Sequence, residues 1–188
     1  PKDHESLASL ACKIEIDDLG SPIGIQDQYI TAYGGQRCIH FTKQGPVVEQ
    51  LQIGDRCLRT LNQNLLLFYT NMTRKANTVL SEQKENIQAR TETLIEIRDL
   101  AYAARDCLKA DEPDHIGTLL NKNWELKKRL ASKISNPIID DLYQTALKAG
   151  ALGGKISGAG GGGFLTLYCP IEMQASVRSA LHSLYELP

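Results

Sequence analysis

The stretch KISGAGGGGFL, residues 155–165, decides how the second half of this sequence folds. It contains a Gly-x-Gly-x-x-Gly pattern, which in dinucleotide-binding proteins follows a strand and opens a helix. Here the flanking segments, 155–157 and 164–169, both predict strands, because the longer one is apolar, β-branched and aromatic. An arrangement of strand, glycine loop and strand excludes a Rossmann unit. A P-loop is excluded as well, since no glycine is followed by Lys-Ser or Lys-Thr.

Glycine occupies five of the six positions from 158 to 163. One or two glycines would suffice for a turn, and each costs roughly 0.5–1 kcal/mol to order relative to alanine. A backbone that must approach another loop or a phosphate closely explains the composition better. A purely structural hairpin turn is the alternative.

Composition places the chain among ordinary globular proteins. Its 188 residues are 42% hydrophobic and 23% charged, with a net charge of -1, which gives no reason to expect nucleic acid or a membrane as partner. No apolar run approaches the roughly 20 residues that span a bilayer. The five cysteines and four histidines are widely scattered. We therefore expect reduced thiols, a cytoplasmic location and no metal site built from His and Cys.

Hydrophobic periodicity predicts helices and strands in an α+β order. The expected helices cover 4–16, 26–33, 70–83, 91–109, 114–132, 137–149 and 172–186; the expected strands cover 38–42, 47–52, 64–69, 155–157 and 164–169. From residue 64 onward this order predicts an antiparallel sheet with helices on one side. A split β-α-β sheet needs one more strand after the last helix. Together with the missing initiator Met, this predicts a sequence truncated at both ends.

A second informative stretch is GSPIGIQDQYITAYGG, residues 20–35. It places Asp27 between two glutamines at the start of an expected helix. The helix N-terminus favours the charged carboxylate by up to about 1 kcal/mol, which suits a group that accepts or orients a proton. The alternative is that Asp27 only caps the helix.

Four motifs together resemble those of the GHMP kinases: GIQDQY (24–29), LFYT-x-x-x-R-x-A (67–76), W-x-x-K (124–127) and GGK-x-S-GAGGGGF (153–164). The resemblance extends over nearly the whole chain. It is strongest to the branch that contains D-glycero-D-manno-heptose 7-phosphate kinases and related sugar 1-kinases. It implies the ferredoxin-like C-terminal domain of this family over 56–188, without its final strand. The last part of the N-terminal domain would cover 1–55.

The resemblance also implies roles for individual residues. Asp27 matches the carboxylate that orients or deprotonates the attacking sugar hydroxyl. The glycine loop matches the family motif beside the nucleotide phosphates, with Ser157, Gly158, Ala159, Gly160, Gly161, Gly162 and Gly163 as its members. Gln26, Gln28 and Tyr29 would line the sugar site. Arg74 would bind an anionic substrate, unless it is simply a solvated helix residue. The implied cofactors are ATP and Mg²⁺, and the implied partner is a small sugar or sugar phosphate.

The sequence departs from the family in ways that affect function. Relatives often carry a basic residue at the position of Ile25 and a glycine at that of Asn71. Their main phosphate loop, first substrate motif and Mg²⁺ ligands normally precede the region matched here. We therefore expect the whole protein to phosphorylate an anomeric hydroxyl and this chain alone to be inactive. A fucose, galactose or mevalonate-type kinase and a non-catalytic ligand-binding module stay open, as do the sugar, the hydroxyl and the oligomeric state.

Overall fold

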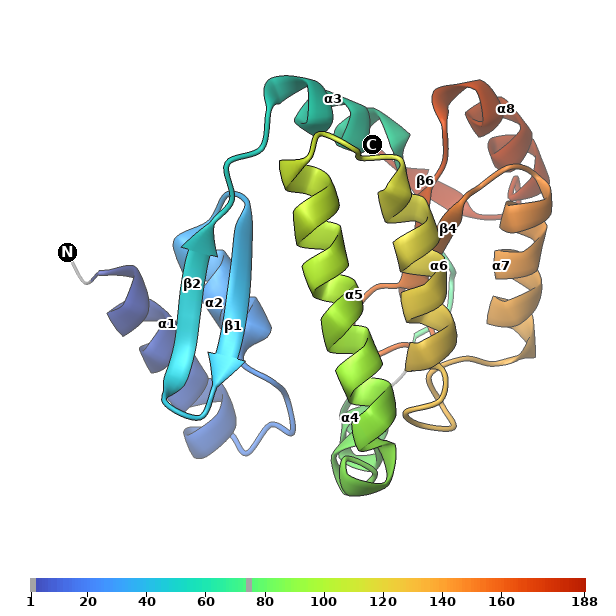
Figure 1. Cartoon of the computed structure of the whole chain (residues 1–188). Helices are drawn as coiled ribbons and strands as arrows, with labels where there is room; N and C mark the ends of the chain where they lie inside the picture. The colour runs from blue at the N-terminus through green and yellow to red at the C-terminus, as the bar shows by residue number, and fades with distance from the viewer. Residues whose placement is uncertain (1–2, 74–75) are drawn as a thin grey trace. The chain divides into compact units, whose positions relative to one another are not determined.

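The computed structural model describes residues 3–73 and 76–188. The chain divides into two compact units, the first ending at Ile53 and the second running from Gly54 to Pro188 (Figure 1).

The first unit holds two helices, a π-helical turn and a hairpin. Helix α1 (His4–Cys12) continues into the π-helix η1 (Lys13–Asp18) and packs against α2 (Gln26–Tyr33). Strands β1 (Arg37–Thr42) and β2 (Gly45–Gln50) pair antiparallel. Helix α2 ends where the sequence predicts, at Gly34, whose φ of 61° is a conformation that glycine adopts without steric cost.

The second unit contains a four-stranded antiparallel sheet. It consists of β3 (Leu65–Tyr69), β4 (Gly153–Ile156), β5 (Phe164–Tyr168) and β6 (Tyr185–Leu187), in the order β4-β5-β3-β6. Leu66 pairs with Leu167, and Phe68 pairs with Leu165. These four side chains are at most 4% exposed, because the period of two in each strand puts them on the core face of the sheet.

Helices build the rest of the second unit: α3 (Asp55–Asn64), α4 (Ala76–Glu85), the 3₁₀ turn η2 (Gln88–Arg90), α5 (Thr91–Lys109), α6 (His115–Lys127), α7 (Pro137–Lys148) and α8 (Ile171–Ala180). Helix α5 lies beside α6, and α6 packs against β4 and β5 (Figure 1). Trp124 and Tyr143 are buried between helices and sheet at the centre of the core. Asn136 caps α7 by accepting a 3.0 Å hydrogen bond from the Ile139 N–H, as its sequence predicts.

This arrangement confirms the expected α+β fold but corrects the end of the sheet. The sequence predicts one long helix over 172–186 and no final strand. In the structure α8 ends at Ala180, and Tyr185–Leu187 form β6 against β3. The expectation of a missing strand was wrong, because three residues suffice to pair with the otherwise open edge of β3.

Two helix boundaries and one whole helix also differ from the sequence prediction. The segment 70–73 is not helical, because its backbone bonds to the glycine loop instead. Helix α6 ends at Lys127, five residues early, where bonds of the i→i+3 type tighten the chain. Helix α3 is absent from the expected elements because Cys57, Leu58 and Leu61 are its only apolar residues.

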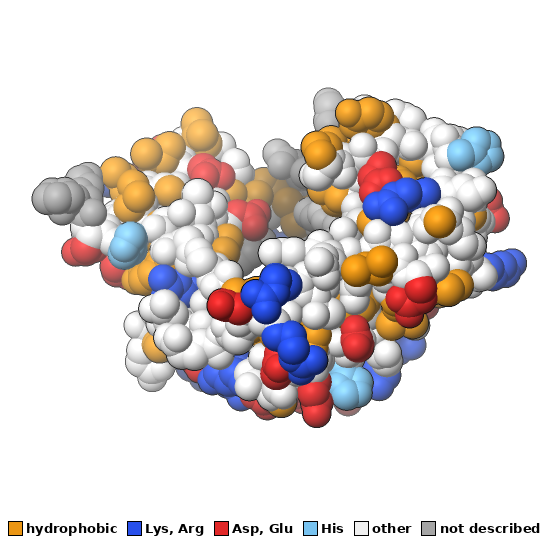
Figure 2. Space-filling model, turned by 90° about the horizontal axis from the view of Figure 1, so that it is seen from above, with side chains coloured by type: hydrophobic (Ala, Val, Ile, Leu, Met, Phe, Trp, Pro, Cys, Tyr) orange, Lys and Arg blue, Asp and Glu red, His pale blue; other side chains and the backbone are white. Residues whose placement is uncertain are grey.

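The surface is mixed in charge. Figure 2 shows acidic and basic side chains interspersed on the face it presents, in keeping with the net charge of -1. Among the described residues, no helix has both the length and the apolar character needed to cross a membrane.

Candidate active site

The glycine loop connects β4 to β5 in a backbone conformation that requires glycine. At its base, the Ser157 N–H donates a 2.8 Å hydrogen bond to the Phe164 carbonyl. All five glycines have positive φ, from 70° at Gly161 to 156° at Gly162. A side chain at these positions would strain the backbone.

Two of these glycines also allow close contact with neighbouring backbone. A Cβ atom added to Gly160 would lie 2.7 Å from the Ile134 carbonyl oxygen, and one added to Gly162 would lie 2.7 Å from that of Met72. The same two carbonyls accept hydrogen bonds from the loop, Ile134 from the Gly161 N–H at 2.5 Å and Met72 from the Gly163 N–H at 2.9 Å. Close approach to other loops therefore accounts for part of the glycine content.

Four amides of the loop have no partner in the described parts of the chain. No hydrogen bond there uses the N–H groups of Gly158, Ala159, Gly160 or Gly162. Gly158 is exposed, and nothing lies within 4 Å of a Cβ placed on it, whereas Gly160 and Gly162 are buried. The exposed end of the loop is therefore the part that a ligand can reach.

Lys127 contacts the loop directly, although the sequence analysis gave it no role. Its Nζ donates a 2.6 Å hydrogen bond to the Gly158 carbonyl. Trp124, one turn earlier on α6, is fully buried and fixes the face of the helix that carries the lysine. The sequence signal for this contact is the W-x-x-K motif, in which a buried aromatic residue precedes the lysine by three positions on the same helix.

Thr70 anchors the other end of the loop. Its N–H and its Oγ1 both donate to the Gly163 carbonyl at 2.9 Å, and the residue is only 4% exposed. It follows β3 directly, so the sheet fixes its place. Sequence analysis assigned no role to this threonine, because its hydrogen-bond partner is 93 positions away.

Asp27 lies in the first unit and lines a cavity of about 430 Å³ between α1, η1 and α2. The cavity is lined by Leu7, Ala11, Glu15, Ile23, Asp27, Gln28, Thr31 and Ala32. Asp27 is exposed, so it can meet a ligand. Gln28 is 7% exposed, and its buried Oε1 has no hydrogen-bond partner among the described residues. A buried acceptor of this kind is costly unless a donor reaches it.

Tyr29 has a different environment from the one expected. It is 3% exposed and its hydroxyl donates a 2.6 Å hydrogen bond to Glu5. That bond raises the pKa of Tyr29, with burial adding to the effect, and lowers the pKa of Glu5. The side chain therefore joins α2 to α1, a geometry that does not favour contact with substrate. Gln26 is exposed at the start of α2.

Arg74 lies outside the described residues. Of the other expected site residues, Asp27 and its neighbours belong to the first unit, and the glycine loop belongs to the second.

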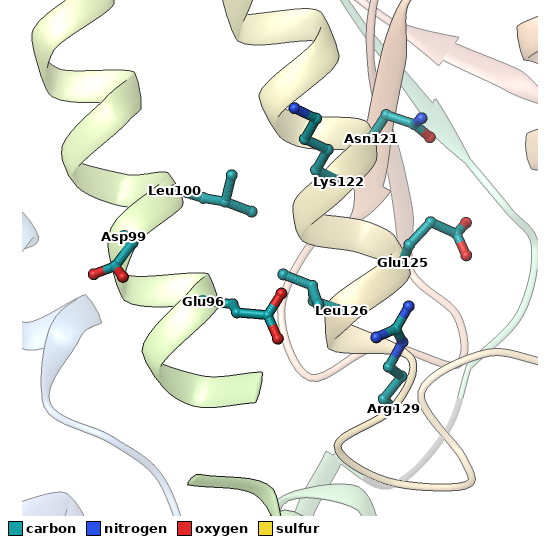
Figure 3. A pocket seen from close by; sticks show the side chains of 8 residues that line it. All are labelled: Glu96, Asp99, Leu100, Asn121, Lys122, Glu125, Leu126 and Arg129. Atoms are coloured by element: carbon teal, nitrogen blue, oxygen red, sulfur yellow. The ribbon is translucent and has the colours of Figure 1, made fainter. Parts of the chain in front are cut away.

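A cavity of the second unit lies apart from the glycine loop. It has a volume of about 520 Å³ and lies between α5 and α6, lined by Glu96, Asp99, Leu100, Asn121, Lys122, Glu125, Leu126 and Arg129. Figure 3 shows Leu100 and Glu96 pointing toward α6 and Leu126 pointing toward α5. Side chains of both signs of charge and two leucines line this cavity, and no residue of the glycine loop does.

Residues 103–186, which contain the glycine loop, match the model described as GHMP kinases C terminal, so this part of the chain is similar to the C-terminal domain of that family.

The similar proteins with assigned activities are kinases. A D-glycero-alpha-D-manno-heptose 7-phosphate kinase of Campylobacter jejuni is 30% identical over 171 residues, which cover 89% of this chain and 50% of that protein. A mevalonate kinase of Thermococcus sibiricus is 29% identical over 190 residues, covering 94% and 51%. The chain spans about half the length of these relatives. The crystal structure of a D-glycero-D-manno-heptose 1-phosphate kinase from Bacteroides thetaiotaomicron has the same fold, with a TM-score of 0.75 at 24% identity, covering 100% of this chain and 52% of that one.

Proposed function

We propose that this chain is part of an ATP-dependent sugar kinase that transfers the γ-phosphoryl group of ATP to the anomeric hydroxyl of a heptose 7-phosphate-like sugar. The observation that carries the proposal is the glycine loop, where four amides have no partner among the described residues and the exposed Gly158 has open space around it. The similarity to a heptose 7-phosphate kinase supports the choice of substrate class.

In this proposal the loop acts through its backbone. Phosphoryl transfer depends mainly on positioning and on neutralising the charge that spreads over the phosphoryl oxygens. Amide N–H groups can donate to those oxygens only where no side chain intervenes, as at Gly158. The loop would hold ATP phosphate oxygens, with Lys127 and Thr70 keeping its two ends in place. ATP supplies the transferred group, and Mg²⁺ would neutralise its phosphates.

Asp27 would act on the acceptor. A carboxylate within hydrogen-bond reach of a sugar hydroxyl can orient it and take its proton as the new bond to phosphorus forms. The exposed position of Asp27 on a cavity suits this role. Gln28 lines the same cavity, and its unpartnered Oε1 would accept a hydrogen bond from a second hydroxyl.

The Mg²⁺ ligands are not identified among the described residues. Each of the two groups of three potential metal ligands in this part of the chain lies apart from the glycine loop in sequence. Because the chain spans about half of its relatives, we propose that the whole protein supplies the Mg²⁺ ligands and the rest of the nucleotide site. The isolated 188 residues would then turn over ATP very slowly or not at all.

A mevalonate-type acceptor is the second candidate, because a mevalonate kinase is nearly as similar over the full chain. The proposed chemistry is the same, since a primary alcohol replaces the anomeric hydroxyl. A ligand-binding module without activity is the third, and the retained Asp27 argues against it.

The test is ADP release by the whole protein with ATP, Mg²⁺ and a panel of heptose 7-phosphate, fucose, galactose, mannose and mevalonate. We expect turnover with a heptose phosphate that falls by at least about 1000-fold in Asp27→Asn, as loss of a proton acceptor and of its orienting charge predicts. Asp18→Asn is the matched control, because Asp18 is an exposed carboxylate of the same unit outside the cavity.

Each other outcome has a distinct meaning. Turnover with mevalonate alone would replace the substrate class but keep the kinase. Full activity in Asp27→Asn would remove Asp27 from the mechanism. ATP binding without turnover on any acceptor would favour the non-catalytic module.

A further inference from the structure

The β1–β2 hairpin brings together three potential metal ligands from its two strands. Cys38 lies directly opposite Glu49 in the antiparallel register, and His40 follows two residues after Cys38 on the same face. The Cys38 Sγ, a ring nitrogen of His40 and a carboxylate oxygen of Glu49 all lie within 4.8 Å of one another. The sequence analysis expected no such site, because spacing along the chain does not show cross-strand pairs.

We propose that Cys38, His40 and Glu49 form a Zn²⁺ site, with water as the fourth ligand. Zn²⁺ binds Cys, His and carboxylate ligands at about 2.0–2.3 Å in a tetrahedron, which places ligand atoms roughly 3.3–3.7 Å apart. The His40 Nε2 and Glu49 Oε2 are already 3.2 Å apart. The Cys38 Sγ lies within 4.8 Å of both atoms, so rotation about side-chain bonds that moves the sulfur by about one ångström would bring it into the range of a tetrahedral site.

Charge and burial agree with a divalent ion of intermediate softness. A thiolate and a carboxylate together balance the two charges of the metal, so the half-buried face would carry no net charge. The side chains of His40 and Glu49 are 24% and 32% exposed, which leaves a path for the ion. Sulfur and imidazole ligands favour Zn²⁺ over Mg²⁺ or Ca²⁺, which prefer oxygen. The proposed site is therefore distinct from any Mg²⁺ that accompanies ATP.

The chain also contains a comparable group that we expect to bind metal poorly. Cys107, Glu112 and His115 meet the same distance limit, but the Glu112 and His115 side chains are 57% and 66% exposed. They lie at the end of α5, in the connection and at the start of α6. Ordering two largely exposed side chains costs more entropy than using the half-buried ligands of a paired hairpin. This second group is a natural internal control.

A bound metal would stabilise the first unit, whose hydrophobic core is small. Among the described residues of that unit, the buried apolar side chains are Ala8, Tyr29 and Leu51. Units of this size gain much of their stability from metals, disulfides or packing partners. A Zn²⁺ ion that joins β1 to β2 would hold the hairpin that follows α2, the helix on which Asp27 lies.

Metal binding has a defined proton balance. The Cys38 thiol loses its proton to solvent and binds as the thiolate. Neutral His40 binds through one ring nitrogen and keeps its proton on the other, and Glu49 binds as the carboxylate. Binding releases the proton of the Cys38 thiol, so affinity falls as the pH is lowered.

The test is a titration of the full 188-residue chain with Zn²⁺, under reducing conditions and in competition with a chromophoric chelator. We expect one tight equivalent, with affinity about 100-fold weaker or more in Cys38→Ser and in Glu49→Gln, since loss of a direct ligand exceeds the effect of a ligand's hydrogen-bond partner. Cys107→Ser and His115→Gln are the matched controls and should bind as the unaltered chain does. Circular dichroism before the titration establishes that each variant is folded.

Co²⁺ provides a second readout that does not depend on variant stability. The unaltered chain should show the thiolate-to-cobalt charge-transfer absorption, and Cys38→Ser should lack it. Absence of a tight equivalent in the unaltered chain would overturn the proposal. Loss of binding in Cys107→Ser with full binding in Cys38→Ser would overturn it equally, by assigning the ion to the other group. Neither readout depends on kinase activity, so the site and the proposed function fail or succeed separately.

Discussion

The ammonium group of Lys127 lies 2.6 Å from the carbonyl oxygen of Gly158, and so α6 holds the exposed end of the glycine loop. A hydrogen bond from a charged donor is stronger than a neutral one, but partial exposure weakens its net effect. The bond therefore matters more for the conformation of the loop than for the stability of the unit.

Replacing this lysine should loosen the loop selectively. In Lys127→Met we expect faster amide hydrogen exchange in the peptide that covers 155–165, with a loss of about 1 kcal/mol or less in the free energy of unfolding. Mass spectrometry of deuterium uptake measures the first quantity and urea unfolding the second. Lys122→Met on the same helix is the control. Unchanged exchange in the loop peptide would show that Lys127 does not hold it.

Alanine substitutions within the loop should have unequal costs. In Gly160→Ala the new methyl group would meet the Ile134 carbonyl oxygen at 2.7 Å, at a φ of 101°. We expect a loss of about 2 kcal/mol or more, from steric clash added to backbone strain. Gly158→Ala has a φ of 77° but open space around the methyl group, and should cost about 1 kcal/mol. Urea unfolding compares the two, and equal losses would contradict the close-approach argument.

Alkaline pH should destabilise the second unit through its buried tyrosines. Burial raises the pKa of Tyr168 from 10.0 to about 12, with a further contribution from its hydrogen bond to Asp114. Between these values the unfolded chain has lost the proton that the folded chain keeps, so stability falls as the pH rises. Each such tyrosine contributes a slope of about 1.4 kcal/mol per pH unit. Urea unfolding at pH values from 9 upward, with each reading taken at equilibrium, measures the slope.

The Tyr168→Phe variant should show a shallower slope over this range, although it also loses the hydrogen bond from Asn64. Burial raises the pKa of Tyr143 too, so part of the slope should remain. Tyr185→Phe, at a residue 64% exposed, is the control and should leave the slope unchanged. An identical slope in Tyr168→Phe would exclude Tyr168 as its source.

Acidic pH should weaken the link between α1 and α2. The hydrogen bond from Tyr29 is the main cause that lowers the pKa of Glu5 below its ordinary 4.5, and one from Tyr33 adds to it. Stability from this group is present above pH 4.5 and is lost as the pH falls through the lower pKa of the folded state. A carbon NMR titration of the Glu5 carboxyl should show that pKa rising in Tyr29→Phe, and rising less in Tyr33→Phe. A Glu5 pKa that does not change in Tyr29→Phe would contradict the assigned cause.

Local patterns in the sequence predicted most of the fold. The Asn136-Pro137 cap and Gly34 stop mark their helices correctly, because both act through neighbouring residues. The glycine loop was placed between two strands by its apolar flanks. Helix α3 was missed because it has few apolar residues, and β6 because a three-residue strand depends on an edge formed by β3.

Sequence analysis predicted only those parts of the candidate site that belong to local motifs. The loop was found from its composition, and Asp27 from a helix start and a family motif. Lys127 and Thr70 were missed because their partners lie 31 and 93 positions away. The group of Cys38, His40 and Glu49 was missed for another reason, because the residues that face each other across a hairpin depend on its strand register, which composition and spacing do not give.

The anchors of the glycine loop also have a consequence for folding. Residues near 70, 127 and 134 must all be in place before the loop can adopt its conformation, and these segments are distant along the chain. Contacts of high sequence separation form slowly, so we expect the loop to be among the last parts of the second unit to become ordered. An anion that binds the loop would then recognise only chains that have finished folding, and would favour them by mass action.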